Sequence, residues 1–170
     1  MPKTPQRWTN APPPKAITGE RRGRLEDADL AMLLGQVLVA WAHFEDQMIS
    51  FFEKLLGVQH GNLDTARLIF YALVAQKIRI EVMRKLLQKA RHNKSKGKRY
   101  DEILDEFEKL NTMRNKYVHG LWWTHENGDT HLQLDNSAFF THVEYRKVTK
   151  KELEGFLSRL NTLWAKVLFL

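Results

Sequence analysis

The chain has 170 residues, of which 43% are hydrophobic, and this length and composition suit one domain built around a single core. It contains no cysteine, which excludes a disulfide framework and thiolate metal sites and favours a cytoplasmic location. The sequence has neither the apolar core of a signal peptide nor an uninterrupted apolar stretch that could span a bilayer, so we expect no membrane anchor.

The net charge of +7 is concentrated in two segments. Residues 1–24 hold six lysines and arginines against one glutamate, and their five prolines predict a disordered basic arm. Residues 91–99 hold five basic residues and no acid. Such clusters attract RNA or DNA through counterion release, and solvated tail and loop lysines are the alternative. The candidate RNA-binding residues of the second segment are Lys94, Lys96, Lys98 and Arg99.

Three helices are predicted before residue 120 from apolar residues spaced by threes and fours. The first covers residues 25–56 and ends at Gly57, and its stripe consists of Leu30, Leu34, Val37, Trp41, Phe44, Met48, Phe51 and Leu55. The second covers about residues 62–91, unless its first two turns form a separate helix, and its stripe consists of Leu68, Tyr71, Leu73, Val74, Ile78, Val82, Leu86 and Leu87. A polar loop at residues 93–98 then precedes a third helix at residues 99–118.

A small β insert is predicted at about residues 120–148, where the apolar period changes to two. A two-residue turn at Asn127-Gly128 would pair Trp123 with Leu132 and leave Trp122 facing outward. Residues 141–148 supply a third strand, and a Thr149/Glu152 capping box starts a last helix at residues 150–168. The predicted fold class is therefore all-α with a three-stranded insert: an antiparallel four-helix bundle over residues 25–170.

The third helix carries an arginine on its apolar stripe, which runs through Ile103, Phe107, Leu110, Arg114, Tyr117 and Val118. Burying a charge costs several kcal/mol unless it is paired or kept for function. The phosphate of a ligand would be a suitable partner for Arg114. His119 ends the same helix, where the negative end of the helix dipole favours imidazolium, and Asn115 lies one turn before it.

These three residues suit RNA cleavage without a metal. His119 would take the 2′-hydroxyl proton or protonate the leaving 5′-oxygen, while Arg114 stabilises the charge that builds on the phosphorane. Asn115 would position either His119 or Arg114. A single histidine cannot serve as both acid and base in one step, so we expect a twofold homodimer to supply the second one.

The segment from Arg114 to His119 resembles the motif of the HEPN superfamily, in which an arginine, a polar residue and several further residues precede a histidine. The resemblance extends to the plan of a long first helix, a motif at the end of a later helix and a closing helix. It implies a dimeric, metal-independent endoribonuclease, often a toxin of a toxin–antitoxin pair or an effector of antiviral defence. The substrate would be tRNA, mRNA or another RNA. Because unrestrained cleavage would be toxic, we also expect an antitoxin or another inhibitory partner.

Four further residues are candidates for supporting roles. Glu45 lies on the first apolar stripe and would orient Arg114 or His119, or else form a structural salt bridge. Asn111 extends the polar wall of the cleft or is solvated helix surface, and Tyr117 continues the stripe beside the motif. Trp122, if outward, would contact an RNA base or a dimer surface.

We expect neither a metal nor a cofactor, because the other histidines lack ligand spacing and no phosphate-binding glycine loop is present. The leading hypothesis is a HEPN-type ribonuclease. The alternatives are a non-catalytic helical module that binds nucleic acid or a partner protein, with Arg114 in a buried ion pair, and a purely structural dimerisation domain.

Overall fold

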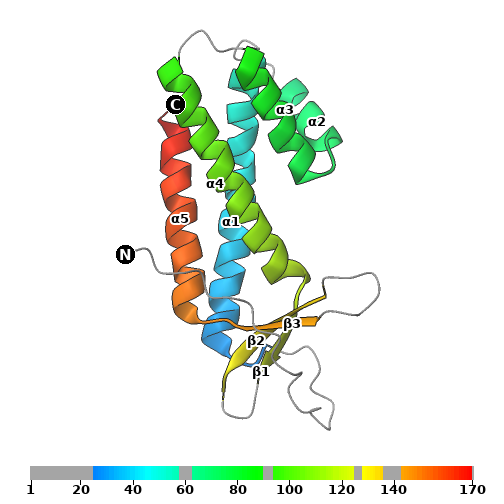
Figure 1. Ribbon diagram of the computed structural model, residues 1–170, viewed down its shortest axis with the longest axis vertical. Helices are drawn as coiled ribbons and strands as arrows, with labels where there is room; N and C mark the ends of the chain where they lie inside the picture. Colours follow the sequence, from blue (N-terminus) through cyan, green and yellow to red (C-terminus); the bar gives the residue numbers. More distant parts are fainter. Residues whose placement is uncertain (1–24, 58–62, 90–93, 125–127, 136–142, 170) are drawn as a thin grey trace. The chain divides into compact units, whose positions relative to one another are not determined.

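A computed structural model describes residues 25–57, 63–89, 94–124, 128–135 and 143–169. These residues form five helices and one antiparallel three-stranded sheet of order β1-β2-β3 (Figure 1). In chain order they are α1 (Ala28–Leu56), α2 (Leu63–Ala72), α3 (Gln76–Lys89), α4 (Lys94–His119), β1 (Leu121–Thr124), β2 (Thr130–Asp135), β3 (Val143–Lys147) and α5 (Lys150–Leu168). The predicted helical class with a small β insert is confirmed. The predicted basic arm at residues 1–24 lies outside the described residues.

The chain divides into two compact units. The helical unit comprises Gln36–Met113 and Gly155–Leu170, and the sheet unit comprises the described residues up to Gly35 together with Arg114–Glu154. The long helices α1, α4 and α5 contribute residues to both units. No helix in the described part of the chain has a stretch apolar and long enough to cross a lipid bilayer.

The core of the helical unit is aromatic. Trp41 of α1 stacks on Phe107 of α4, with ring centroids 5.4 Å apart, and its ring lies 6.4 Å from that of Phe156 on α5. Phe44 meets Phe107 edge-on at 5.5 Å. These rings fill the space between three helices because the predicted stripe of α1 faces inward, which confirms the prediction for this helix. The predicted span of the last helix, residues 150–168, is also confirmed.

The second predicted helix is divided, and its predicted stripe is wrong in part. A break at residues 73–75 separates α2 from α3, which agrees with the alternative of a separate short helix. Four residues assigned to the stripe, Leu68, Tyr71, Val74 and Ile78, are exposed. The break lets α2 and α3 turn different faces inward, and the buried residues include Phe70 of α2 and Met83 of α3.

The polar loop predicted at residues 93–98 is also incorrect, because α4 already begins at Lys94. Lysine is a good helix former, and one glycine, Gly97, costs a helix only about 1 kcal/mol. The segment therefore continues the helix in spite of its polar composition.

The register between β1 and β2 in the sheet unit differs from the predicted one. Trp122 pairs with Leu132 and Trp123 with His131, one residue away from the predicted pairing. Five residues join β1 to β2 instead of two, with Gly128 at a positive φ of 82°. Because side chains alternate across a strand, the slip of one residue exchanges its faces. Trp122 is consequently buried at 8% exposure, and the prediction that it faces outward is wrong.

Candidate active site

The motif occupies the last turns of α4, within the sheet unit. The helix continues to His119, and the amide of Gly120 donates a final hydrogen bond of 3.0 Å to the carbonyl oxygen of Lys116. Strand β1 begins one residue later at Leu121. His119 therefore lies at the junction between a helix C-terminus and the first strand of the sheet.

The Arg114 side chain is half-buried and turns toward its neighbour in the sequence. Its Nη1 atom donates a hydrogen bond of 2.8 Å to Oδ1 of Asn115. Along a helix, Arg114 and His119 point about 140° apart, whereas Asn115 and His119 differ by only about 40°. The hydrogen bond thus draws the guanidinium onto the flank of the helix that carries His119.

Tyr117 and Trp122 brace this helix end. The Tyr117 ring is buried at 1% exposure, and its hydroxyl donates to Oε1 of Glu152 over 2.7 Å. The same carboxylate oxygen pairs with Arg146 of β3. The indole Nε1 of Trp122 donates a 2.9 Å hydrogen bond to the carbonyl oxygen of Tyr117, one of the four carbonyls that a helix C-terminus leaves without an intrahelical partner. Trp122 thus has a structural role and is not an exposed platform for a base.

Gly120 allows the sheet to approach the helix end closely. A Cβ atom at this position would lie 2.5 Å from Cδ1 of Leu132 and 2.8 Å from the carbonyl oxygen of Lys116. Leu132 is fully buried. The packing of β2 against the residue directly after His119 therefore depends on the absence of a side chain at Gly120.

The imidazole of His119 is exposed. Among the described residues, nothing donates to it, accepts from it or pairs with it. The end of α4 therefore carries an accessible imidazole together with the Arg114–Asn115 hydrogen bond on the neighbouring turn.

The two other supporting candidates belong to the helical unit. Glu45, whose side chain is 23% exposed, pairs with Nη1 of Arg79 at 3.5 Å. This contact matches the structural salt bridge that was the alternative for Glu45. Asn111 is half-buried on α4. The structure therefore places neither residue with Arg114 in one compact unit.

The candidate RNA-binding lysines and arginine lie at the start of α4, also in the helical unit. Lys98 and Arg99 are exposed. The side chains of Lys94 and Lys96 lie outside the described residues, although their backbone is helical.

The outer face of the hairpin differs from the face predicted from the sequence. Trp123 and His131 lie directly opposite each other on β1 and β2, and both are half-buried. An aromatic ring at the position of Trp123 can stack on a base, which was the role predicted for Trp122. The Asn127-Gly128 dipeptide favours a two-residue turn, which gave the wrong register. A five-residue loop would have predicted the observed pairing of the two strands and therefore the observed outer face.

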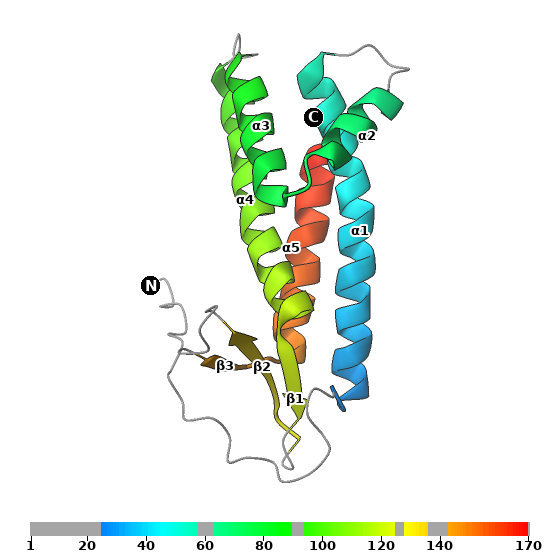
Figure 2. The same ribbon diagram turned by 90° about the vertical axis from the view of Figure 1, so that its right-hand side faces the viewer.

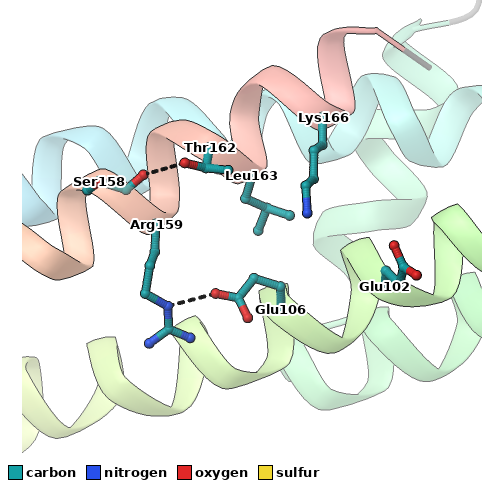
Figure 3. Close-up of a pocket in the computed structure, with 7 residues that line it drawn as sticks. All are labelled: Glu102, Glu106, Ser158, Arg159, Thr162, Leu163 and Lys166. Carbon is teal, nitrogen blue, oxygen red and sulfur yellow. Dashed lines mark hydrogen bonds and ion pairs between the residues drawn. The ribbon is translucent and has the colours of Figure 1, made fainter. Parts of the chain in front are cut away.

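A depression of about 320 Å³ lies between α4 and α5 in the helical unit (Figure 3). Its lining residues are Glu102, Glu106, Ser158, Arg159, Thr162, Leu163 and Lys166. Nε of Arg159 donates to Oε1 of Glu106 over 2.7 Å, so its guanidinium is already engaged by a carboxylate. The lining holds two glutamates, one arginine and one lysine, so its formal charge is balanced.

No known protein family, no curated protein and no solved structure matches the chain. Within the described ranges, no group of three or more histidine, aspartate or glutamate side chains is arranged to hold a metal ion.

Proposed function

We propose that the protein is a metal-independent endoribonuclease of the HEPN type, with its active site at the end of α4. The observation that supports this most directly is the hydrogen bond of 2.8 Å between Arg114 Nη1 and Asn115 Oδ1, on the flank of the accessible His119. A HEPN-type four-helix arrangement of α1, α3, α4 and α5 belongs to the same proposal.

In the proposed reaction the 2′-oxygen of one ribose attacks the adjacent phosphorus. A bond forms between O2′ and phosphorus, and the bond between phosphorus and O5′ breaks. One imidazole accepts the proton from O2′ and a second imidazolium gives a proton to O5′. Arg114 stabilises the extra negative charge on the phosphorane oxygens, and Asn115 holds its guanidinium in position. The products are a 2′,3′-cyclic phosphate and a 5′-hydroxyl.

The reaction needs two imidazoles and the motif holds one, so the proposal includes a homodimer in which each copy contributes His119. The exposed Lys98 and Arg99 would bind the RNA backbone through its phosphates. Trp123 replaces Trp122 as the candidate for stacking on a base.

Cleavage of cellular RNA would inhibit growth unless it is restrained. We therefore include in the proposal a role as a toxin or defence effector that acts on tRNA or mRNA under the control of an inhibitory partner. Expression of the wild-type chain should slow growth, whereas the His119→Ala variant at the same level should not.

The decisive experiment is an RNA cleavage assay in EDTA with the wild-type chain, His119→Ala and Arg114→Ala. The matched controls are His43→Ala and Arg67→Ala, which remove an exposed histidine and an exposed arginine of the helical unit. All variants are first checked for folding by circular dichroism. We expect products with cyclic phosphate ends from the wild type and both controls, and a loss of at least about a hundredfold in each motif variant.

Two outcomes contradict the proposal. Cleavage that survives in both motif variants would mean that the site lies elsewhere. If several RNAs, tRNA and mRNA included, are bound but not cut, and binding weakens steeply with salt, the chain is a nucleic-acid-binding module without catalysis.

A further inference from the structure

His119 depends on the backbone of α4 for its position. Its imidazole is exposed, and within the described ranges it forms no hydrogen bond and no ion pair. His119 is also the last residue of its helix, where carbonyl groups lack intrahelical partners and the final turn tends to fray. The contacts that hold the last turn of α4 therefore decide where the imidazole can reach.

Tyr117, two residues before His119, is held at both ends. Its backbone carbonyl oxygen accepts a hydrogen bond of 2.9 Å from Nε1 of Trp122, which belongs to the strand that directly follows the helix. Its buried side chain reaches further, because the hydroxyl donates to Oε1 of Glu152 over 2.7 Å. The Tyr117 hydroxyl thus joins the helix end to a distant part of the sheet unit.

Glu152 has a fixed position of its own. It lies in the first turn of α5, where the helix dipole favours a carboxylate. Its backbone amide donates to the carbonyl oxygen of Thr149 over 3.0 Å. Its Oε1 atom also pairs with Arg146, and the two side chains are only 18% and 27% exposed. This shielding from solvent makes the pair stronger than an ion pair on an open surface, so the carboxylate that receives the Tyr117 hydroxyl is well held.

Glu152 joins three elements of one compact unit. Figures 1 and 2 show α4 continuing into β1, and β3 leading into the start of α5. Tyr117 belongs to the end of α4, Arg146 to β3 and Glu152 to the start of α5. All three residues lie within the sheet unit. One carboxylate therefore ties the motif to both the last strand and the last helix.

We propose that Glu152 is a positioning residue, which holds the last turn of α4 through the Tyr117 hydroxyl and thereby sets the reach of His119. The effect on catalysis rests on the proposed function, in which the imidazole must come within hydrogen-bond distance of a ribose oxygen or a leaving oxygen. A displacement of about 1 Å at such a group costs up to about a hundredfold in rate. Glu152 itself does not contact the RNA and acts only through Tyr117.

Three single variants and one double variant separate the hydrogen bond from the charge. Tyr117→Phe removes only the donor and Glu152→Ala removes the acceptor, so each should lower kcat for RNA by about tenfold and change KM by less than about twofold. Glu152→Gln keeps an oxygen that can accept from the hydroxyl, and its kcat should stay within about threefold of the wild type. The double variant Tyr117→Phe/Glu152→Ala should be no worse than either single variant, because both remove the same bond.

Two variants of the helical unit serve as matched controls. Tyr100→Phe removes a hydroxyl that has no hydrogen-bond partner in the described part of the chain. Glu106→Ala removes the carboxylate that pairs with Arg159 across two helices. Both controls should cleave RNA at the wild-type rate.

Amide hydrogen exchange, followed by NMR, tests the same contact without RNA. The reporter is the amide of Gly120, which donates to the carbonyl oxygen of Lys116 over 3.0 Å and closes the last turn of α4. Its exchange should accelerate about fivefold in Tyr117→Phe and Glu152→Ala, because the last turn opens more often without the hydrogen bond. Glu152→Gln and both controls should exchange at the wild-type rate, and circular dichroism should show every variant folded.

Three results would overturn the proposal. The first is exchange at Gly120, or a kcat, that is unchanged in Tyr117→Phe. The second is a loss in Glu152→Gln as large as that in Glu152→Ala, since the charge and not the hydrogen bond would then matter. The third is a rise in KM at constant kcat, which would assign Glu152 to RNA binding. A wild-type chain that cuts no RNA would refute the proposed function alone, and the exchange rates would then decide whether Glu152 holds the helix end.

Discussion

Replacing Gly120 with alanine tests the close packing that supports His119. The added methyl group would lie 2.5 Å and 2.9 Å from two carbons of Leu132, and 2.8 Å from the carbonyl oxygen of Lys116. The leucine can shift its rotamer only within a filled core, and the carbonyl belongs to the helix backbone. Gly120 does not have a positive φ, so the penalty is steric and not conformational.

Overpacking of this kind destabilises a protein by about 1–3 kcal/mol. For a chain of this size, each kcal/mol shifts the unfolding temperature by about 2–4 °C, so Gly120→Ala should lower it by about 2–12 °C. Thermal and urea unfolding followed by circular dichroism measure the change. RNA cleavage should also fall, because the displaced helix end carries His119.

Two other glycines serve as matched controls. Gly35 and Gly155 lie inside α1 and α5, and an added Cβ meets nothing within 4 Å at either position. Alanine there should stabilise the protein by about 0.5–1 kcal/mol through its higher helix propensity. In the Leu132→Ala background, Gly120→Ala should be less damaging, although the contact with the Lys116 oxygen remains. If Gly120→Ala instead unfolds at or above the wild-type temperature, the described packing of β2 against α4 is wrong.

Three further predictions concern other contacts. Asn115→Ala should lower kcat for RNA by about tenfold with little change in KM, because the guanidinium loses its positioning hydrogen bond; an unchanged kcat would remove Asn115 from the site. Arg79→Met should reduce the free energy of unfolding by about 2–4 kcal/mol, because it removes the short hydrogen bonds of Arg79 to Leu73 and Gln76. Glu45→Gln should reduce it by less than about 1 kcal/mol, because the ion pair between Arg79 and Glu45 is long. Equal losses in urea denaturation would contradict this ranking. The hydrogen bond and the charge of Lys150 lower the pKa of Asp29, so this pair stabilises the fold above the ordinary carboxyl pKa and ceases to do so as the pH falls through the lowered value. The Asp29 midpoint in an NMR titration should therefore rise in Lys150→Met, and an unchanged midpoint would show that the pair does not form in solution.

The helices and their ends were largely predictable from local sequence. The stripe of α1, its end at Gly57 and the span of α5 depend on residues within one or two turns of each other. The helix periodicity and the preference of glycine for positive φ act over this short range. The motif at the end of α4 was visible in the sequence for the same reason.

The arrangement of the side chains around the motif depended on contacts between distant segments. Pairing between β1 and β2 decided which tryptophan is buried, because a shift of one residue exchanges the two faces. The hydrogen bond of Tyr117 to Glu152 joins residues that are 35 positions apart. Only the tertiary structure identified Arg79 as a buried arginine paired with Glu45, since nothing near either residue in the sequence specifies the other.

Four exposed apolar residues of the second predicted helix also depended on the tertiary structure. The sequence determined that Leu68, Tyr71, Val74 and Ile78 are apolar and regularly spaced, and this pattern predicts a core stripe. Only the folded chain decided that, among the described residues, these four side chains stay exposed. Periodicity determines which side chains of a helix share a face, but what covers that face depends on the other elements that pack against it.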